Sequence, residues 1–284
     1  MSTDVQTTEQ SLASRIAELV ESDTIQLPPL PAVVIKAREL LSSENSNAKA
    51  LGTLLAEDAA IVAALMRVAN SASFGGLGRI DTLNNAIQRI GQRQVGAIIL
   101  GLGLKNAFRH GQPAKARILE VLWNHSVTSA FAARAIAGRT GLDPERAFLA
   151  GLLHDCGKVL VLSALDAIEE SGSVQPVTDG AMRELMNALH CELGHRVLKS
   201  WNLPDDVAQV ALLHHEKARA GQELILAVQA ANLITRRLGF HLEPDPTLTV
   251  VDDPIIEELG LTDIQVATLM VDMEMHLEEM RQLF

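Results

Sequence analysis

Apolar side chains recur along most of the chain three and four residues apart, which is the spacing of a helix buried on one face. Ile61, Leu65 and Val68 form one such stripe, and Asp58 stands before it as a capping residue. The alternation of apolar and polar residues that is typical of a half-buried β-strand does not occur over any useful length. The pattern therefore predicts an all-α fold.

Helix-breaking residues divide this pattern into separate helices. Gly91 and Gly141 stand where glycine commonly ends a helix, and Asp143-Pro144 supplies a capping carboxylate followed by a first-turn proline. The predicted helices cover about residues 11–21, 32–41, 59–69, 94–108, 114–140, 181–200, 204–213 and 222–238. Others are predicted to begin at Asn45 or Ser46, at Asp81 or Thr82, at Asp143 (a helix that contains residues 154–155), at Asp253 and at Thr262.

Two boundaries organise these helices. Gly111-Gln-Pro113 separates an N-terminal helical half, residues 11–110, from a second helical half, residues 113–240, and a proline-containing linker opens the C-terminal segment, residues 241–284. This last segment carries eleven Asp and Glu residues against a single basic residue, Arg281, so that most of the net charge of −11 belongs to it. We expect it to dock on the domain as a solvated acidic helix or to bind a partner.

Composition narrows the function classes. The chain is 48% apolar but only 3% aromatic, which predicts an aliphatic core. No basic stripe with interleaved aromatic residues is present, so nucleic-acid binding is not expected. No run of about eighteen apolar residues suggests a membrane span, and the first ten residues do not resemble a secretory signal. With two unpatterned cysteines as well, we expect a cytoplasmic protein.

The most unusual stretch is Gly151-Leu-Leu-His-Asp-Cys-Gly-Lys158, where His154 and Asp155 lie together in an apolar run. Burying an imidazole and a carboxylate costs several kcal/mol unless they are paired or bound to a cation. A lone His-Asp pair is usually satisfied by its neighbours, but this one is accompanied by further histidines in the same part of the chain. They are His125, His190, His195, His214 and His215. Imidazole and carboxylate are complementary metal ligands, so the pattern indicates a metal centre, live or vestigial.

Several separated motifs, in order, resemble the HDOD family, the HD-related output domain of bacterial signalling proteins within the HD superfamily of metal-dependent phosphohydrolases. The resemblance covers about residues 20–235. Its N-terminal motifs are Leu27-Pro-Pro-Leu-Pro31, Glu57-Asp58, Leu65-Met-Arg-Val-Ala-Asn70-Ser71, and Ala86-Ile87 with Ile90-Gly91. Its later motifs are Trp123 with His125, His154-Asp155 with Gly157-Lys158, His190, Trp201-Asn-Leu-Pro204 and His214-His215-Glu216.

The resemblance implies a ligand set and a chemistry. The matching metal ligands are His125, His154, Asp155, His190, His214 and His215. In active members such residues hold divalent cations, here iron, manganese, zinc or nickel, which activate water for phosphoester hydrolysis. In an active protein Asp155 and Lys158 would be the catalytic residues, with Lys158 either contacting a phosphate from the side of His154 or simply solvated. His195 lies about 140° round the helix from His190 and is expected to point elsewhere.

Two departures from the superfamily pattern bear on activity. Asn232 stands where the pattern has its closing Asp, and an amide oxygen is a weaker, uncharged ligand. No Gly-Tyr-Pro follows Glu216, unlike the HD-GYP phosphodiesterases that cleave cyclic di-GMP. HDOD domains are generally without demonstrated catalysis. Three readings stay open: a signalling or scaffold domain with a protein partner, a metal-dependent phosphohydrolase acting on a nucleotide or other phosphoester, and a metal or ligand sensor without turnover.

Overall fold

The computed structural model describes residues 12–16, 18, 32–41, 43, 47–71, 74, 78–107, 113–172 and 177–283. Within these ranges the regular structure is helical and no strand is present, which confirms the all-α prediction. The motif Leu27-Pro-Pro-Leu-Pro31 and Gly111, the first residue of the predicted boundary, lie outside the described residues.

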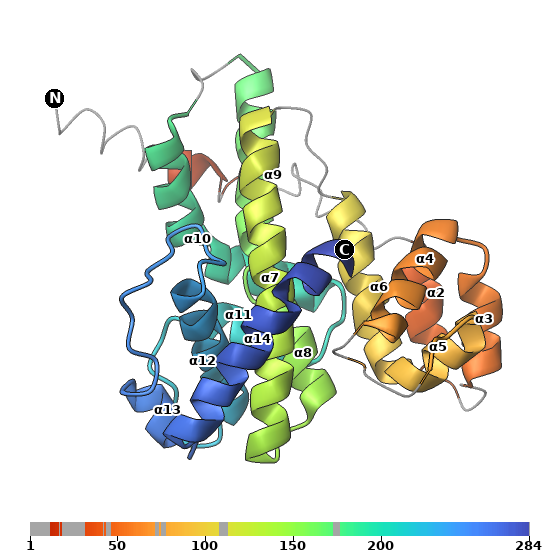
Figure 1. Ribbon diagram of the computed structural model, residues 1–284. Coiled ribbons are helices and arrows are strands. Elements are labelled where there is room, and N and C mark those ends of the chain that lie inside the picture. Colours follow the sequence, from red (N-terminus) through yellow and green to blue (C-terminus); the bar gives the residue numbers. More distant parts are fainter. Residues whose placement is uncertain are drawn as a thin grey trace, which may run out of the picture.

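The N-terminal half forms a small helical bundle to one side of the molecule, and Figure 1 shows its last helix lying against the rest of the chain. Leu51, Leu65 and Ile87 are fully buried, so that its core is aliphatic as the composition predicts. Its described helices are α2 (Ala32–Leu41), α3 (Ala48–Leu55), α4 (Ala59–Asn70), α5 (Leu83–Ile90) and α6 (Gln92–Ala107).

The N-terminal ends of these helices follow the capping chemistry that the sequence suggests, with one correction. The Asp58 carboxylate accepts hydrogen bonds from the backbone N–H groups of Ala60 and Ile61, at 2.9 and 3.1 Å. Thr82 caps α5. The predicted cap of α3 at Asn45 or Ser46 is wrong, because the side chain of Asn47 accepts the bond from the N–H of Ala50.

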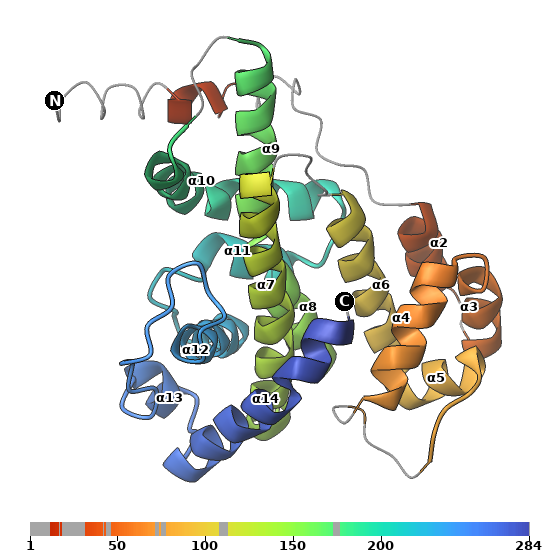
Figure 2. The ribbon, with the colours of Figure 1, turned by 45° about the horizontal axis from the view of Figure 1, so that its top comes forward.

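The second half is built around a long helix that runs through the middle of the molecule in both views (Figures 1 and 2). This helix, α7, packs against α8 and α12, while α9 packs against α10 and α10 against α11. The bounds are α7 (Pro113–Thr140), α8 (Pro144–Leu153), α9 (Cys156–Glu170), α10 (Asp179–Ser200), α11 (Asp205–Leu213) and α12 (Glu223–Arg237).

The chain breaks its helix at His154 and Asp155, where the sequence pattern predicts an uninterrupted one. His154 ends α8, and Asp155 turns the backbone with φ −104° and ψ 9° before α9 begins. Among the described residues, Pro144–Glu170 is the stretch long and apolar enough to cross a membrane, but 83% of its apolar window is buried inside the domain. Such burial is typical of helices in the core of a folded domain, and α8 and α9 form part of this core.

The acidic C-terminal segment is docked on the domain. Helix α14 (Asp263–Leu283) follows the short α13 (Pro254–Glu258), crosses α7 and also contacts α4 of the N-terminal half. Figure 2 shows it running obliquely over α7 and α8 towards α6. Asp272 forms an ion pair with Arg139 of α7 at 3.6 Å. Helix α14 therefore bridges the two halves.

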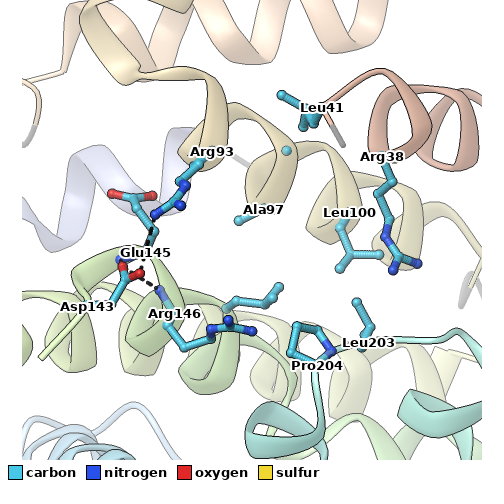
Figure 3. A pocket seen from close by; sticks show the side chains of 12 residues that line it. Arg38, Leu41, Arg93, Ala97, Leu100, Asp143, Glu145, Arg146, Leu203 and Pro204 are labelled. Atoms are coloured by element: carbon cyan, nitrogen blue, oxygen red, sulfur yellow. Dashed lines mark hydrogen bonds and ion pairs between the residues drawn. The ribbon is translucent and has the colours of Figure 1, made fainter. Parts of the chain in front are cut away.

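A cavity of about 330 Å³ lies where the halves meet, between α2, α6, α8 and the segment before α11. Figure 3 shows Arg38 from α2 and Arg146 from α8 on opposite sides of it, and Arg93 pointing to Asp143. Arg38 donates to the backbone carbonyls of Trp201 and Asn202, at 2.6 and 2.7 Å. These two hydrogen bonds tie the N-terminal half to the loop that follows α10.

Candidate metal centre

Two glycines beside His154-Asp155 allow neighbouring helices to approach closely. A Cβ atom on Gly151 would lie 2.7 Å from the carbonyl oxygen of Ser129 in α7. A Cβ atom on Gly157 would lie 1.9 Å from the carbonyl oxygen of His190 in α10. Only glycine permits backbones to meet at such distances. The break between α8 and α9 is therefore held against both α7 and α10, the helices that carry His125 and His190.

The carboxylate of Asp155 is the point on which the cluster converges. Its Oδ2 atom lies 3.4 Å from Nε2 of His125 and 3.6 Å from Nε2 of His154. Its Oδ1 atom lies 3.4 Å from Nε2 of His190 and 3.5 Å from Nε2 of His214. All five side chains are at most 3% exposed. Oδ1 has no hydrogen-bond partner, although it is buried.

Backbone carbonyls fix the tautomers of the four buried histidines. Nδ1 of His125, His154, His190 and His214 lies 2.7 to 3.0 Å from the carbonyl oxygens of Phe240, Gly151, Met186 and Ala211, respectively. A carbonyl oxygen only accepts, so each Nδ1 carries the proton and donates it. In a neutral imidazole the other nitrogen, Nε2, then has a bare lone pair. Four such lone pairs point into one small volume.

These lone pairs meet at short distances. Nε2 of His125 lies 3.2 Å from Nε2 of His154, and Nε2 of His190 lies 3.3 Å from Nε2 of His214 and 3.1 Å from Nε2 of His215. Contacts between bare acceptors are unfavourable unless a proton or a cation lies between them. Two ligands about 2.1 Å from one cation at a tetrahedral angle are roughly 3.4 Å apart, which is the spacing found here. The arrangement fits a metal.

Burial argues against a proton as the intervening charge. Loss of solvation lowers the pKa of His154 well below its usual value, despite the nearby charge of Asp155. The same cause lowers the pKa of His190 to about 4. Burial alone would raise the pKa of Asp155, but the nearby charge of Lys158 holds it well below its usual range. His154 and His190 are therefore neutral at neutral pH and lie beside the ionised carboxylate of Asp155.

The ligand atoms fall into two groups. The first comprises His125, His154 and Asp155, and the second comprises His190, Cys191, His214 and His215, with the atoms in each group all within 4.8 Å of one another. The structure thus brings together all six residues that the resemblance nominates as metal ligands. His195 belongs to neither group among the described residues.

Two residues at the centre were not predicted. Cys191 lies beside His190 and places Sγ 3.4 Å from its Nε2 atom; the adjacency in sequence was the available signal. The ring of His241 stacks edge-on against His125, with ring centroids 4.9 Å apart, and burial lowers its pKa to about 3. His241 stands in the irregular segment before α13, where no periodic pattern marks it.

Lys158 and Asn232 occupy positions that restrict chemistry. The ammonium group of Lys158 is buried and donates to Oδ2 of Asp155 at 2.6 Å, so that it pairs with the carboxylate instead of reaching outward to a phosphate. Asn232 lies on α12, and its Oδ1 atom is buried without a hydrogen-bond partner. An unpaired buried oxygen is suited to a ligand role, although it supplies no charge.

Comparison with known proteins places this arrangement in a family. The model of the HDOD domain matches residues 27–217. An uncharacterized protein of Treponema pallidum (strain Nichols) is 27% identical over 248 residues, which are 83% of this chain and 46% of that protein. The chain therefore spans less than half the length of this relative.

Solved structures share the fold over most of the chain. A protein of Shewanella amazonensis SB2B classed as a metal-dependent phosphohydrolase matches with a TM-score of 0.80 and 22% identity, covering 98% of this chain and 99% of that chain. A protein of Marinobacter aquaeolei VT8 classed with signal transduction matches with a TM-score of 0.64 and 19% identity, covering 94% of this chain and 64% of that chain. At these identities the likeness establishes the helical fold.

Proposed function

We propose that this chain, which belongs to the HDOD family, is a signalling domain whose His/Asp centre binds a divalent metal and supports little catalysis. The observation that carries the proposal is the convergence of four Nε2 lone pairs on Asp155, each oriented by a backbone hydrogen bond from Nδ1. A hydrogen bond from the other ring nitrogen to a backbone carbonyl holds a metal-ligating histidine in one tautomer and one orientation.

Each side chain of the centre has a definite part in this proposal. His125, His154 and Asp155 would hold one cation, and His190, His214 and His215 would contribute to a second. A bound divalent cation supplies Lewis acidity and lowers the pKa of a coordinated water. The chain itself supplies a buried, rigid cage, because the histidines are held by backbone carbonyls and the helices by close glycine contacts.

We propose low catalytic capacity because a phosphoester has little access to the first ligand group and because the centre, in the part of the chain that the structure describes, lacks a free cationic side chain and a closing carboxylate. The first group of ligands is buried, which leaves little room for a phosphoester beside it. Lys158 is committed to Asp155, and Asn232 supplies an amide where the superfamily pattern has a carboxylate. A signalling role, with a protein partner, is supported by membership of the family and by the shared fold of the Marinobacter protein.

Phosphoester hydrolysis is a second candidate, because the second ligand group reaches the surface. His215 is exposed and Cys191 is partly exposed, so that a small phosphoester or nucleotide could approach from that side. If the domain is active, hydrolysis should depend on added manganese, iron, zinc or nickel and should disappear in Asp155→Asn.

Elemental analysis of the purified protein, with His154→Ala beside it, tests the proposal. We expect a stoichiometric divalent metal in the wild type and its loss in the variant, with helical content by circular dichroism largely retained. A wild-type protein that stays metal-free after incubation with these ions would refute metal binding. Turnover of phosphodiester or nucleotide substrates by the metal-loaded protein would favour the second candidate.

A further inference from the structure

The second ligand group contains a sulfur atom. Sγ of Cys191 lies with Nε2 of His190, His214 and His215 in a set whose atoms are all within 4.8 Å of one another. His190 and His214 are buried and held through Nδ1 by backbone carbonyls, so two of the four ligands are fixed in orientation. The set draws on both α10 and the turn that follows α11.

We propose that His190, Cys191, His214 and His215 form a closed three-histidine, one-thiolate site for zinc or a similar borderline cation. The inference rests on the proposed metal-binding function and gives the two ligand groups different chemistries. Four nitrogen and sulfur ligands are the usual complement of a structural zinc site, which keeps no position open for water. Thiolate favours zinc, cobalt or iron over magnesium and manganese, which prefer oxygen ligands.

The first group has the opposite character. His125, His154 and Asp155 offer two imidazoles and one carboxylate, a three-ligand set that leaves coordination positions for other groups. Asp155 touches both groups, because Oδ2 faces His125 and His154 while Oδ1 faces His190 and His214. A cation in the closed site would therefore lie beside Oδ1 and attract the carboxylate by its charge, without a bond to it. The closed site acts as a structural clamp on the first group rather than as a reaction centre.

The two cysteines of the chain form a matched pair for testing this assignment. Cys156 lies in the first turn of α9, and its sulfur is directed to the carbonyl oxygen of Gly194, 4.0 Å away. It is absent from both ligand groups, although it directly follows Asp155 in sequence. Replacement of Cys156 by alanine thus removes a nearby thiol without removing a proposed ligand.

Cobalt(II) titration of the metal-stripped full-length chain is the decisive experiment, with Cys191→Ala and Cys156→Ala in parallel. A cobalt–thiolate bond gives an intense near-ultraviolet charge-transfer band that cobalt bound to nitrogen and oxygen alone lacks. We expect the band in the wild type and in Cys156→Ala and its loss in Cys191→Ala. Zinc affinity should fall at least about a hundred-fold in Cys191→Ala, since loss of an outer-shell partner alone costs about 10–100-fold.

A second measurement uses the unaltered protein. Zinc should protect Cys191 from alkylation, mapped by mass spectrometry, and a chelator should restore its reactivity. Cobalt binding without a charge-transfer band, or alkylation of Cys191 at the same rate with and without zinc, would overturn the thiolate ligand and leave the histidine centre standing. Failure of the wild type to bind cobalt or zinc at all would overturn both the thiolate site and the proposed function.

Discussion

Replacement of Gly157 by alanine tests the close crossing on which the centre depends. The added Cβ would lie 1.9 Å from the carbonyl oxygen of His190 and 2.7 Å from the backbone nitrogen of Gly194. Both are backbone atoms of α10, so no side-chain rotation relieves the overlap, and α9 and α10 must separate by roughly 1.5 Å to reach an ordinary contact. Overpacking of this kind costs about 1–3 kcal/mol, and a clash of backbone with Cβ belongs at the upper end.

The separation should also damage the metal centre, because His190 is carried by the helix that moves. A displacement of roughly 1.5 Å takes Nε2 of His190 well outside a metal–nitrogen bond of about 2.1 Å. Urea unfolding of the metal-free protein and zinc affinity by chelator competition measure the two effects. We expect Gly157→Ala to lose about 3 kcal/mol of unfolding free energy and to bind zinc at least about a hundred-fold more weakly.

The matched control is Gly138→Ala, in an exposed turn of α7 where an added Cβ meets nothing within 4 Å. Alanine exceeds glycine in helix propensity by about 1 kcal/mol, so this variant should be more stable than the wild type and bind metal equally well. The same substitution then has opposite signs at the two positions. A Gly157→Ala protein within about 0.5 kcal/mol of wild type and with unchanged zinc affinity would show that α9 and α10 do not meet there.

Two further predictions concern charge at the centre. Asn232→Asp should tighten metal binding, since it adds a negative charge where an unpaired amide oxygen is buried. Chelator competition measures the affinity, with Asn85→Asp at an exposed position as the control. An affinity equal to that of the control would contradict this prediction. Acid should destabilise the metal-free protein as pH falls from about 6.5 to about 4. Burial lowers the pKa of His190 to about 4, so that in this range the unfolded chain binds a proton at His190 and the folded protein does not. Each such histidine contributes at most about 3 kcal/mol, and urea midpoints that stay flat over this range would refute the neutral, buried state.

Much of the helical architecture follows from local sequence. The stop at Gly141 and the Asp143-Pro144 start are local signals, and the structure has α7 ending at Thr140 and α8 starting at Pro144. The break at His154 and Asp155 could not be predicted in this way, because residues 144–170 carry helical apolar patterning throughout. At the break the Asp155 carboxylate makes no capping bond; it faces Lys158, three residues on, and histidines from other helices, which local patterning cannot show.

The residues of the candidate site likewise include some that the sequence could indicate and others that only the fold brings to the site. The His154-Asp155 pair in an apolar run and the recurring histidines indicated a metal centre, and the resemblance to the HDOD family implied the six ligands, which the structure brings together. His241 was not predicted because only the fold brings it to the centre. The segment after α12 folds back against α7, where the carbonyl of Phe240 accepts a hydrogen bond from Nδ1 of His125. An irregular segment that folds back in this way has no hydrophobic periodicity by which the sequence could reveal it.

The pairing of Lys158 with Asp155 suggests that the ammonium group and a metal compete for one carboxylate. Lys158 is only 3% exposed and donates to Oδ2, the atom that faces His125 and His154. In the metal-free protein this ion pair neutralises the charge of the Asp155 carboxylate. A divalent cation bound at the first ligand group would share Oδ2 with a positive charge 2.6 Å away, which is unfavourable in a buried site.

Lys158→Met should therefore destabilise the metal-free protein by about 3–5 kcal/mol, since it strands a buried carboxylate, and should raise metal affinity at least about ten-fold. Lys115→Met is the control, because Lys115 is equally buried and paired with Asp166 and Glu169 away from the centre. It should lose stability without a change in metal affinity. Weaker metal binding in Lys158→Met than in Lys115→Met would mean that Lys158 organises Asp155 for the metal instead of competing with it.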